Sequence, residues 1–540
     1  MMLREWGLVA RDAPQPIPNG PRDVTDLVAT ARRARPNHEA LVGRHRAFTF
    51  AEVEAAAGVA TAALAALGVR AGDRVAASLP NQPELVIAFL GAMRLGAIWV
   101  GINTALAPAE KLHMLADCDA MLLLTTAEIA SSVEPFRSVT VDLAGLAGTW
   151  VDACTSAERD DRRAPLVLVD PHAPAAIAYT SGTTGFPKGA VHSQHNMLWP
   201  GADARDNDPG PPNERHGVVL PLTLLNLMIL GPLFAWSKGT TCICVDRTDP
   251  IGLRDWIAQS RITRMTFAPT IVHDLLRHPD VAVDDLVSLR RPECGGSSTP
   301  NALRELFLER FGAPVLTGYG LTEAPTAVAR EMPGDELLAG CSGVPFAPVE
   351  VVVVDQNGGV LDAGTEGEIC VRARTTGPWT GVYTPFLGYW NRPLATEHAL
   401  RSHMLHTGDI GVIDAMGRVF VKDRMTDVVI RGGANVYPAE VERVLHEHPG
   451  VAACAVLGVP DDRLGERVVA VVQPMADVAL DPVDLVVYCR NLLARYKVPE
   501  RWAFVDDFAR TPMGKIPKAT LRALFDAPGS SALSRPPSSP

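Results

Sequence analysis

The sequence predicts an α/β protein with a large N-terminal domain, in which helices sandwich mixed and parallel sheets, and a small α+β C-terminal domain. Three observations support this class. Strand and helix patterns alternate along the first half of the chain. After Gly343, short strands separated by turns such as Asn357-Gly358 indicate an antiparallel β subdomain. After Arg424, two strands lie between amphipathic helices in a short segment.

Local signals place the predicted elements in order. Gly68 and Gly96 follow helical patterns and Pro83 begins one, because glycine favours helix C-termini and proline favours first turns. Pro438 begins a helix in the small domain in the same way. The patterns predict helices at 24–35, 51–67, 83–95, 300–311 and 483–493, and strands at 48–50, 74–79, 121–125, 175–179, 452–457, 467–472 and 502–505.

The chain length of 540 residues is too great for one compact core, so two or more domains are expected. We predict a flexible arm at 1–20, a large domain at 21–424, a small domain at 425–526 and a disordered tail at 527–540.

The composition excludes several classes of function. A net charge of −11 without a long basic run argues against nucleic-acid binding. Nine scattered cysteines without a C-x-x-C pair are expected to be core thiols of a reducing compartment, and no signal peptide is evident, which predicts a cytoplasmic protein. The apolar run 218–236 is interrupted by Pro221 and Pro232, so we interpret it as a buried core helix and expect no integral membrane contact.

A glycine- and hydroxyl-rich segment, YTSGTTGFPKGAVHS, covers residues 179–193 and follows a short apolar strand. Such a loop can direct backbone N–H groups, hydroxyls and a lysine toward a polyphosphate. It differs from a Walker A motif because Pro187, rather than glycine, precedes Lys188. The alternative is an ordinary polar surface loop.

The segment resembles the phosphate loop of the adenylate-forming superfamily, which includes acyl-CoA synthetases, aryl-CoA ligases, peptide-synthetase adenylation domains and luciferases. Four further motifs resemble those of the same superfamily and occur in the same order, and together they cover most of the chain. The resemblance implies that the small domain is mobile, and that the loop holds the β- and γ-phosphates of ATP. Its predicted ATP contacts are Thr180, Ser181, Gly182, Thr183, Thr184 and Lys188.

The second motif is TGYGLTE at 317–323. The resemblance implies that Tyr319 stacks on adenine, Thr322 contacts the α-phosphate, and Glu323 binds Mg²⁺, a cation that prefers carboxylate oxygens. Thr322 and Glu323 are therefore predicted catalytic residues, whereas the alternative is a structural turn with a surface glutamate. The remaining predicted nucleotide contacts near this motif are Thr317, Gly318, Gly320 and, on the second glycine turn, Gly296 and Ser297.

The last three motifs lie toward the C-terminus. The resemblance implies that Asp409, in HTGD, binds the ribose hydroxyls with help from Arg424. It places the hinge at Thr426, where many relatives have Lys or Asp, so this position departs from the pattern. Gly432 and Gly433 would line a CoA tunnel. Lys515, in PMGK, would bridge the carboxylate and the α-phosphate as the catalytic lysine, and Lys518 is expected to be a solvated charge.

The acid-binding pocket is less clearly marked. We expect it to be lined by Leu224, Leu225, Asn226, Gly295, Gly320 and Pro325. The run around Leu224 contains no Asp to pair with an α-ammonium group, which argues against amino-acid substrates and favours a hydrophobic acid. The alternative is that these leucines belong to the core.

We therefore predict an acyl-CoA synthetase that uses ATP, Mg²⁺ and CoA, has no tightly bound organic cofactor, and is a monomer or homodimer. The alternatives are an acyl-AMP ligase that loads an acyl carrier protein, and a non-catalytic relative. The additional residues 375–386 (TTGPWTGVYTPF) are expected to form a surface loop, which could also hinder domain rotation.

Overall fold

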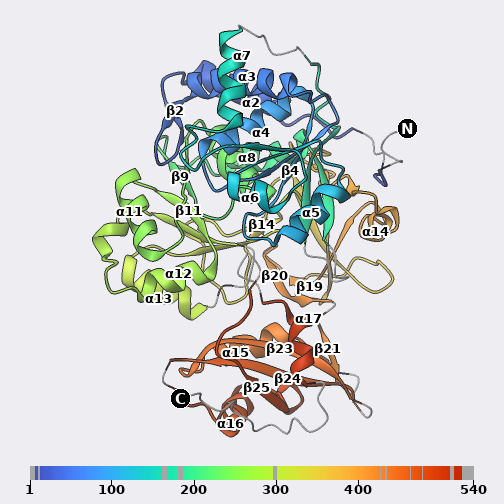
Figure 1. Ribbon diagram of the computed structural model, residues 1–540. Coiled ribbons are helices and arrows are strands. Elements are labelled where there is room, and N and C mark those ends of the chain that lie inside the picture. Colours follow the sequence, from blue (N-terminus) through green and yellow to red (C-terminus); the bar gives the residue numbers. More distant parts are fainter. Residues whose placement is uncertain are drawn as a thin grey trace.

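The computed structural model describes residues 6–9, 13–160, 167–180, 187–295, 299, 301–425, 427–431, 434–461, 464–476, 478–510 and 516–525. Two sheets flanked by helices form the large body in Figure 1, the antiparallel strands around β19 and β20 lie below them, and the small domain is at the bottom. Together with the separate C-terminal α/β unit, this arrangement confirms the predicted fold class.

A seven-stranded sheet carries the glycine-rich segment. Its strands from β6 to β7 pair in parallel, whereas β8 is antiparallel to both of its neighbours, β7 and β18. The strand order is β18-β8-β7-β4-β3-β5-β6. The bounds are β3 (Arg74–Ser78), β4 (Ile98–Gly101), β5 (Leu122–Thr125), β6 (Ser138–Thr140), β7 (Pro174–Thr180), β8 (Lys188–Ser193) and β18 (Gly388–Tyr389).

A nine-stranded sheet forms the other half of the large body, in the order β15-β14-β13-β12-β11-β9-β10-β1-β2. In its parallel centre, the end of β13 lies beside the end of β12. The end of β13 carries the second predicted motif, at 317–323. The bounds are β1 (Glu39–Val42), β2 (Ala47–Thr49), β9 (Arg215–Val218), β10 (Thr241–Cys244), β11 (Arg264–Phe267), β12 (Arg291–Cys294), β13 (Leu316–Tyr319), β14 (Ala329–Arg330) and β15 (Val344–Pro345).

Helices α3 and α4 of the large domain begin or end at the predicted signals. Thr49 and Glu52 form a capping box on α3, and Gly96 ends α4 in the left-handed region at φ 68°. The helices are α2 (Val24–Ala34), α3 (Phe50–Ala66), α4 (Pro83–Leu95), α5 (Pro108–Asp117), α6 (Ala127–Ser132), α7 (Thr149–Arg159), α8 (Gln194–Asn207), α9 (Leu225–Met228), α10 (Phe234–Ser237), α11 (Pro250–Ser260), α12 (Pro269–Arg277), η2 (Val283–Leu286), α13 (Asn301–Phe311) and α14 (Pro393–Ala399).

The antiparallel subdomain is a four-stranded sheet of β16 (Val349–Val354), β17 (Gly367–Ala373), β19 (Leu405–Ile413) and β20 (Val419–Arg424). The small domain has its own two apolar clusters. Its elements are β21 (Val429–Arg431), β22 (Ala434–Val436), α15 (Pro438–His446), β23 (Val451–Asp461), β24 (Gly465–Pro474), α16 (Pro482–Leu492), η3 (Arg495–Lys497), β25 (Arg501–Phe504), α17 (Lys518–Leu521) and η4 (Arg522–Phe525).

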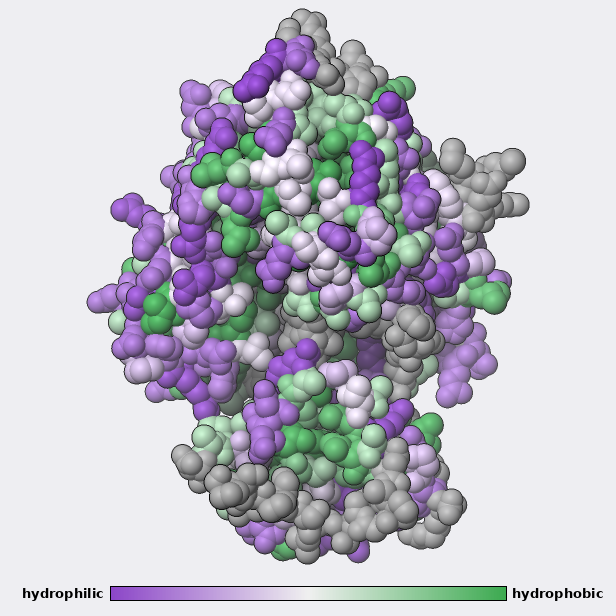
Figure 2. Space-filling model, in the orientation of Figure 1, coloured by the Kyte–Doolittle hydropathy of each residue, from purple (hydrophilic) through white to green (hydrophobic). Residues whose placement is uncertain are grey.

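The apolar run 218–236 is not one regular helix. Between α9 and α10 the chain forms a π-helical segment, η1 (Ile229–Leu233), which contains Pro232. Among the described residues, no helix is both long and apolar enough to cross a membrane. In the view of Figure 2, hydrophilic residues are spread over the face of the large domain, and hydrophobic residues gather at the centre of the small domain.

Two segments expected at the surface pack into the large domain instead. In the N-terminal arm, Leu8 and Ile17 are buried, and the backbone N–H of Val9 donates to the carbonyl of Leu387. In the additional segment 375–386, Tyr383 and Phe386 are almost fully buried. The expectations of a loose arm and a surface loop are wrong for these residues, because their aromatic and aliphatic side chains fill the core.

Candidate functional site

Lys188 lies at the start of β8, directly after the predicted phosphate loop. β7 and β8 form an antiparallel hairpin in which Thr180 pairs with Lys188, and the Thr180 hydroxyl donates to the Lys188 carbonyl over 3.4 Å. Ser193 then caps α8 by accepting from the N–H of Asn196. The hairpin therefore holds Lys188 at one end of the loop. The predicted contacts Ser181, Gly182, Thr183 and Thr184 lie outside the described residues.

Asp409 is the point where three predicted nucleotide residues meet. Its Oδ2 accepts a hydrogen bond of 2.5 Å from the Tyr319 hydroxyl, and its Oδ1 lies 2.6 Å from Nε of Arg424. β19 and β20 pair Asp409 with Arg424, which explains their proximity. Burial, and then the Asp409 charge, raise the pKa of Tyr319, so the phenol remains protonated and donates. The site thus contains a buried, oriented carboxylate.

Glu323 and Thr322 lie in the turn after β13, and both are half-buried. Oε1 of Glu323 accepts a hydrogen bond of 2.6 Å from Tyr389, a residue that the sequence analysis did not assign to the site. His192 packs beneath this turn. Burial lowers the pKa of His192 to about 3, and the nearby Thr322 backbone opposes that shift only partly.

Two buried residues missed by the sequence analysis support the same motif. Oε2 of Glu331 accepts from both the backbone N–H (2.7 Å) and the hydroxyl (3.0 Å) of Thr317. Arg304 of α13 pairs with Glu331 over 2.6 Å and donates to the Val315 carbonyl. The Thr317 side chain is therefore engaged in fixing β13, and its contact with the nucleotide stays a prediction, as does that of Gly318.

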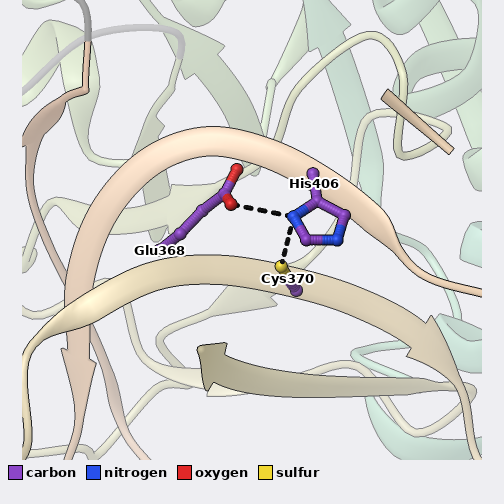
Figure 3. Close-up of side chains that lie close together, drawn as sticks. All are labelled: Glu368, Cys370 and His406. Carbon is purple, nitrogen blue, oxygen red and sulfur yellow. Dashed lines mark hydrogen bonds and ion pairs between the residues drawn. The ribbon is translucent and has the colours of Figure 1, made fainter. Parts of the chain in front are cut away.

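Glu368, Cys370 and His406 form a buried cluster behind Asp409, shown in Figure 3. Nδ1 of His406 lies 2.8 Å from Oε2 of Glu368 and 3.3 Å from Sγ of Cys370. The Glu368 carboxylate also accepts hydrogen bonds from the Arg401 guanidinium and from the backbone N–H of Gly408. Burial raises the pKa of the Cys370 thiol to about 12. A protonated thiol and a carboxylate bonded to three donors favour hydrogen bonding over metal ligation. We interpret the cluster as support for the turn that carries Asp409.

The predicted acid-pocket residues divide into two groups. Leu225 and Pro325 are buried, and Leu225 belongs to the main hydrophobic cluster, whereas Leu224 and Asn226 are half-buried. Among the residues that the structure describes, a Cβ added to Gly295 would meet nothing closer than a Thr266 methyl carbon at 3.9 Å. A Cβ on Gly320 would lie 1.7 Å from the Thr326 carbonyl oxygen. Gly320 therefore permits close backbone packing rather than opening the pocket.

Several predicted site residues lie outside the described residues. They are Gly296, Ser297, Thr426, Gly432, Gly433 and Lys515. Lys518 is described, and the expectation of a solvated charge is wrong. Its Nζ pairs with Oε1 of Glu442 over 2.7 Å, because α17 packs beside α15, and the same oxygen accepts from the N–H of Val456.

Comparisons with known proteins identify the family of the chain. The AMP-binding enzyme model matches residues 28–383, and the AMP-binding enzyme C-terminal domain model matches residues 440–515. The chain is 36% identical to a feruloyl-CoA synthase of Amycolatopsis sp over 502 residues, which cover 92% of this chain and 98% of the relative. It is 34% identical to a long-chain-fatty-acid–CoA ligase of Mycobacterium tuberculosis over 488 residues, which cover 89% and 93%.

A solved structure gives the same result at the level of the fold. The anthranilate CoA ligase AuaEII in complex with anthranoyl-AMP superposes with a TM-score of 0.83 at 27% identity, covering 94% of this chain and 98% of that chain. The family models, the relatives and the shared fold agree on one class of enzyme. The chain therefore belongs to the AMP-binding enzymes of the adenylate-forming superfamily, and it is an acid–thiol ligase of the acyl-CoA synthetase class.

Proposed function

We propose that this acyl-CoA synthetase activates a hydrophobic carboxylic acid with ATP and Mg²⁺, in a site built around Asp409. The observation that carries the proposal is the pairing of the buried Asp409 carboxylate with Tyr319 and Arg424. An ionised double acceptor at this point can bind the two ribose hydroxyls. Lys188 and Glu323 both contact Tyr389, so the predicted phosphate and metal residues are close to each other.

Glu323 fits the requirements of a magnesium ligand. Mg²⁺ prefers oxygen donors, and no described residue bonds to Oε2 of Glu323, whereas Oε1 is held by Tyr389. When bound, the ion would offset the negative charge of the ATP phosphates. The Lys188 ammonium would stabilise the charge that builds on the leaving pyrophosphate, and the Thr322 hydroxyl would contact the α-phosphate.

The reaction has two steps. A carboxylate oxygen of the acid attacks the α-phosphorus, the bond to pyrophosphate breaks, and acyl-AMP forms. The thiol sulfur then attacks the acyl carbonyl carbon and AMP leaves. Lys515 would neutralise the two anions that meet in the first step, and rotation at Thr426 would bring Gly432 and Gly433 to the thiol in the second.

The predicted pocket residues support a hydrophobic acid. Leu224 is half-buried beside the cluster that contains Leu225, and within the described part of the chain a Cβ on Gly295 would meet only a Thr266 methyl carbon, at 3.9 Å. The walls offer apolar contact, which suits an aromatic, alicyclic or fatty acid. The feruloyl-CoA and long-chain-fatty-acid–CoA relatives fall within the same broad class.

The first experiment measures acid-dependent exchange of pyrophosphate into ATP over a panel of aromatic, alicyclic and fatty acids. Exchange with apolar acids and not with amino acids is expected, and it should require Mg²⁺. AMP release with CoA, compared with loading of a carrier protein, then separates a CoA ligase from a carrier-protein ligase. Absence of exchange with every acid would contradict the proposal.

Lys515→Ala tests the division of the work between the two steps. Adenylation should be abolished, because the cation that offsets the approaching charges is lost, while thioester formation from synthetic acyl-AMP should largely persist. Both half-reactions are measured on one preparation, so each serves as a control for folding in the other. Equal loss of both would show that the assignment of Lys515 is wrong.

A further inference from the structure

Tyr389 lies on β18, the edge strand of the seven-stranded sheet, next to the β7–β8 hairpin. β18 pairs antiparallel with β8, with Tyr389 opposite Ala190. Lys188 is two residues before Ala190, so its side chain is on the same face of the sheet as the Tyr389 ring. The Lys188 ammonium lies 5.2 Å from the ring centroid, which is within the range of a cation–π contact.

The Tyr389 ring is held on several sides. Its backbone N–H donates to the hydroxyl of Thr396 at 2.8 Å, and its ring packs edge-to-face on Phe386 at 4.7 Å. Tyr389 is only 9% exposed. Phe386 belongs to the additional segment 375–386, so that segment builds one wall of this site.

The Tyr389 hydroxyl reaches the other predicted ATP motif. It donates to Oε1 of Glu323 over 2.6 Å, and the backbone N–H of Phe386 donates to the Glu323 carbonyl at 2.8 Å. The Tyr389 side chain therefore contacts both the ammonium group of Lys188, on the β7–β8 hairpin, and the carboxylate of Glu323, in the turn after β13.

We propose that Tyr389 is a positioning residue that uses its hydroxyl to orient Glu323 toward Mg²⁺ and its ring to orient Lys188 toward the ATP phosphates. The proposal rests on the proposed roles of Glu323 and Lys188. A hydrogen bond on Oε1 directs Oε2 toward the ion and restricts rotation of the carboxylate, as partners of metal ligands commonly do. The ring face restricts a long, flexible ammonium side chain in the same way.

Two substitutions separate the contributions of the hydroxyl and the ring. Y389F removes the hydroxyl and keeps the ring, whereas Y389L removes both. Y488F is the matched control, because it deletes a tyrosine hydroxyl from α16 of the small domain. ATP binding is measured by isothermal titration with Mg²⁺ and with EDTA, and the Mg²⁺ dependence of pyrophosphate exchange is measured in parallel.

For Y389F, ATP binding in EDTA should equal that of wild type, while the Mg²⁺ concentration needed for half-maximal exchange should rise about tenfold or more. Y389L should, in addition, bind ATP several-fold more weakly without metal, because Lys188 loses its ring contact. Y488F should behave as wild type in every assay. Adding Y389F to E323Q should produce no further loss of metal dependence, because Tyr389 acts through Glu323.

Three outcomes would overturn the inference. One is Y389F with the metal dependence of wild type. Another is Y389F with equal loss of ATP binding in Mg²⁺ and in EDTA, which would indicate general distortion of the site. The third is full additivity of Y389F and E323Q. If the wild-type protein binds ATP equally well with Mg²⁺ and with EDTA, the proposed role of Glu323 as a Mg²⁺ ligand would be contradicted. That result differs from one in which only the role of Tyr389 is contradicted.

Discussion

At the scale of single residues, three of the predicted motifs are supported by a partner that the motif pattern does not include. Glu331 fixes Thr317, Glu368 receives the N–H of Gly408 beside Asp409, and Tyr389 contacts Glu323. These partners lie far from the motifs in sequence, so spacing gives no signal for them. Their common property is that a buried polar atom needs a partner, and the fold determines which residue can supply it.

Asp409→Asn tests the central carboxylate. The amide keeps the size of the side chain but removes the charge, so hydrogen bonds to the ribose should lose their charge-assisted strength of about 1.5–3 kcal/mol. The KM for ATP in pyrophosphate exchange should rise by about 10- to 150-fold, from that energy at about 1.4 kcal/mol per factor of ten. D362N, at an exposed turn of the same subdomain, is the control. A KM close to that of wild type in a folded D409N protein would contradict the role of Asp409.

At the scale of elements, glycine has two different uses in the same site. Gly320 lies where the backbone of the TE turn folds back on itself, with the Thr326 carbonyl occupying the position of a side chain. Thr326 itself has φ of 72°, which is unusual for a β-branched residue and indicates a tightly constrained turn. At Gly295, which follows β12, an added Cβ would by contrast meet no atom of the described residues closer than 3.9 Å.

The pair Gly320→Ala and Gly295→Ala distinguishes these uses. G320A should lower the free energy of unfolding by about 1–3 kcal/mol or more, because its Cβ cannot fit without moving backbone. G295A should unfold at the denaturant concentration of wild type but show a higher KM for bulky acids than for small ones. Denaturant unfolding and acid kinetics on both variants provide the measurement. A stable G320A protein, or a G295A protein with unchanged acid preference, would contradict the respective assignment.

At the scale of the whole molecule, burial keeps several histidines neutral. It lowers the pKa of His192 to about 3 and that of His195 to about 4. His216 is lowered well below its usual pKa by burial and by the nearby Arg264, Lys238 and Arg291. In the unfolded chain each histidine takes up a proton near pH 6.5. Below that pH the unfolded state binds more protons, so folding stability falls as the pH falls.

The free energy of unfolding should therefore decrease between about pH 6.5 and pH 4. The three histidines together account for a slope of about 4 kcal/mol per pH unit at most, at about 1.4 kcal/mol for each proton. Urea titrations at several pH values measure the slope. H216F should reduce it, because the variant no longer titrates, whereas H273Q, at an exposed site, should leave it unchanged. A stability that is flat between pH 6.5 and 5 would contradict this account.

The sequence predicted the elements well where local chemistry determines them. Gly96 and Pro83 marked the ends of α4, and Asn357-Gly358 lies in a turn between β16 and β17 as expected. It failed where packing of distant segments decides the outcome. The segment 375–386 was expected to be a surface loop because it is an insertion, yet His195 contacts the carbonyl of Val382 and the side-chain amide of Asn196 donates to the carbonyl of Pro385. No local pattern predicts a partner nearly two hundred residues away.

The sequence by itself determined the superfamily, the class of reaction and the identity of the predicted ligands, because phosphate, ribose and metal chemistry each require particular side chains in short motifs. Only the tertiary structure decided how those ligands are held. Asp409 acquired Tyr319 and Arg424 through the pairing of β19 with β20 and the position of β13, and Lys188 and Glu323 acquired a shared neighbour in Tyr389. Side-chain orientation depends on contacts between segments distant in sequence, and these form only when the sheets assemble.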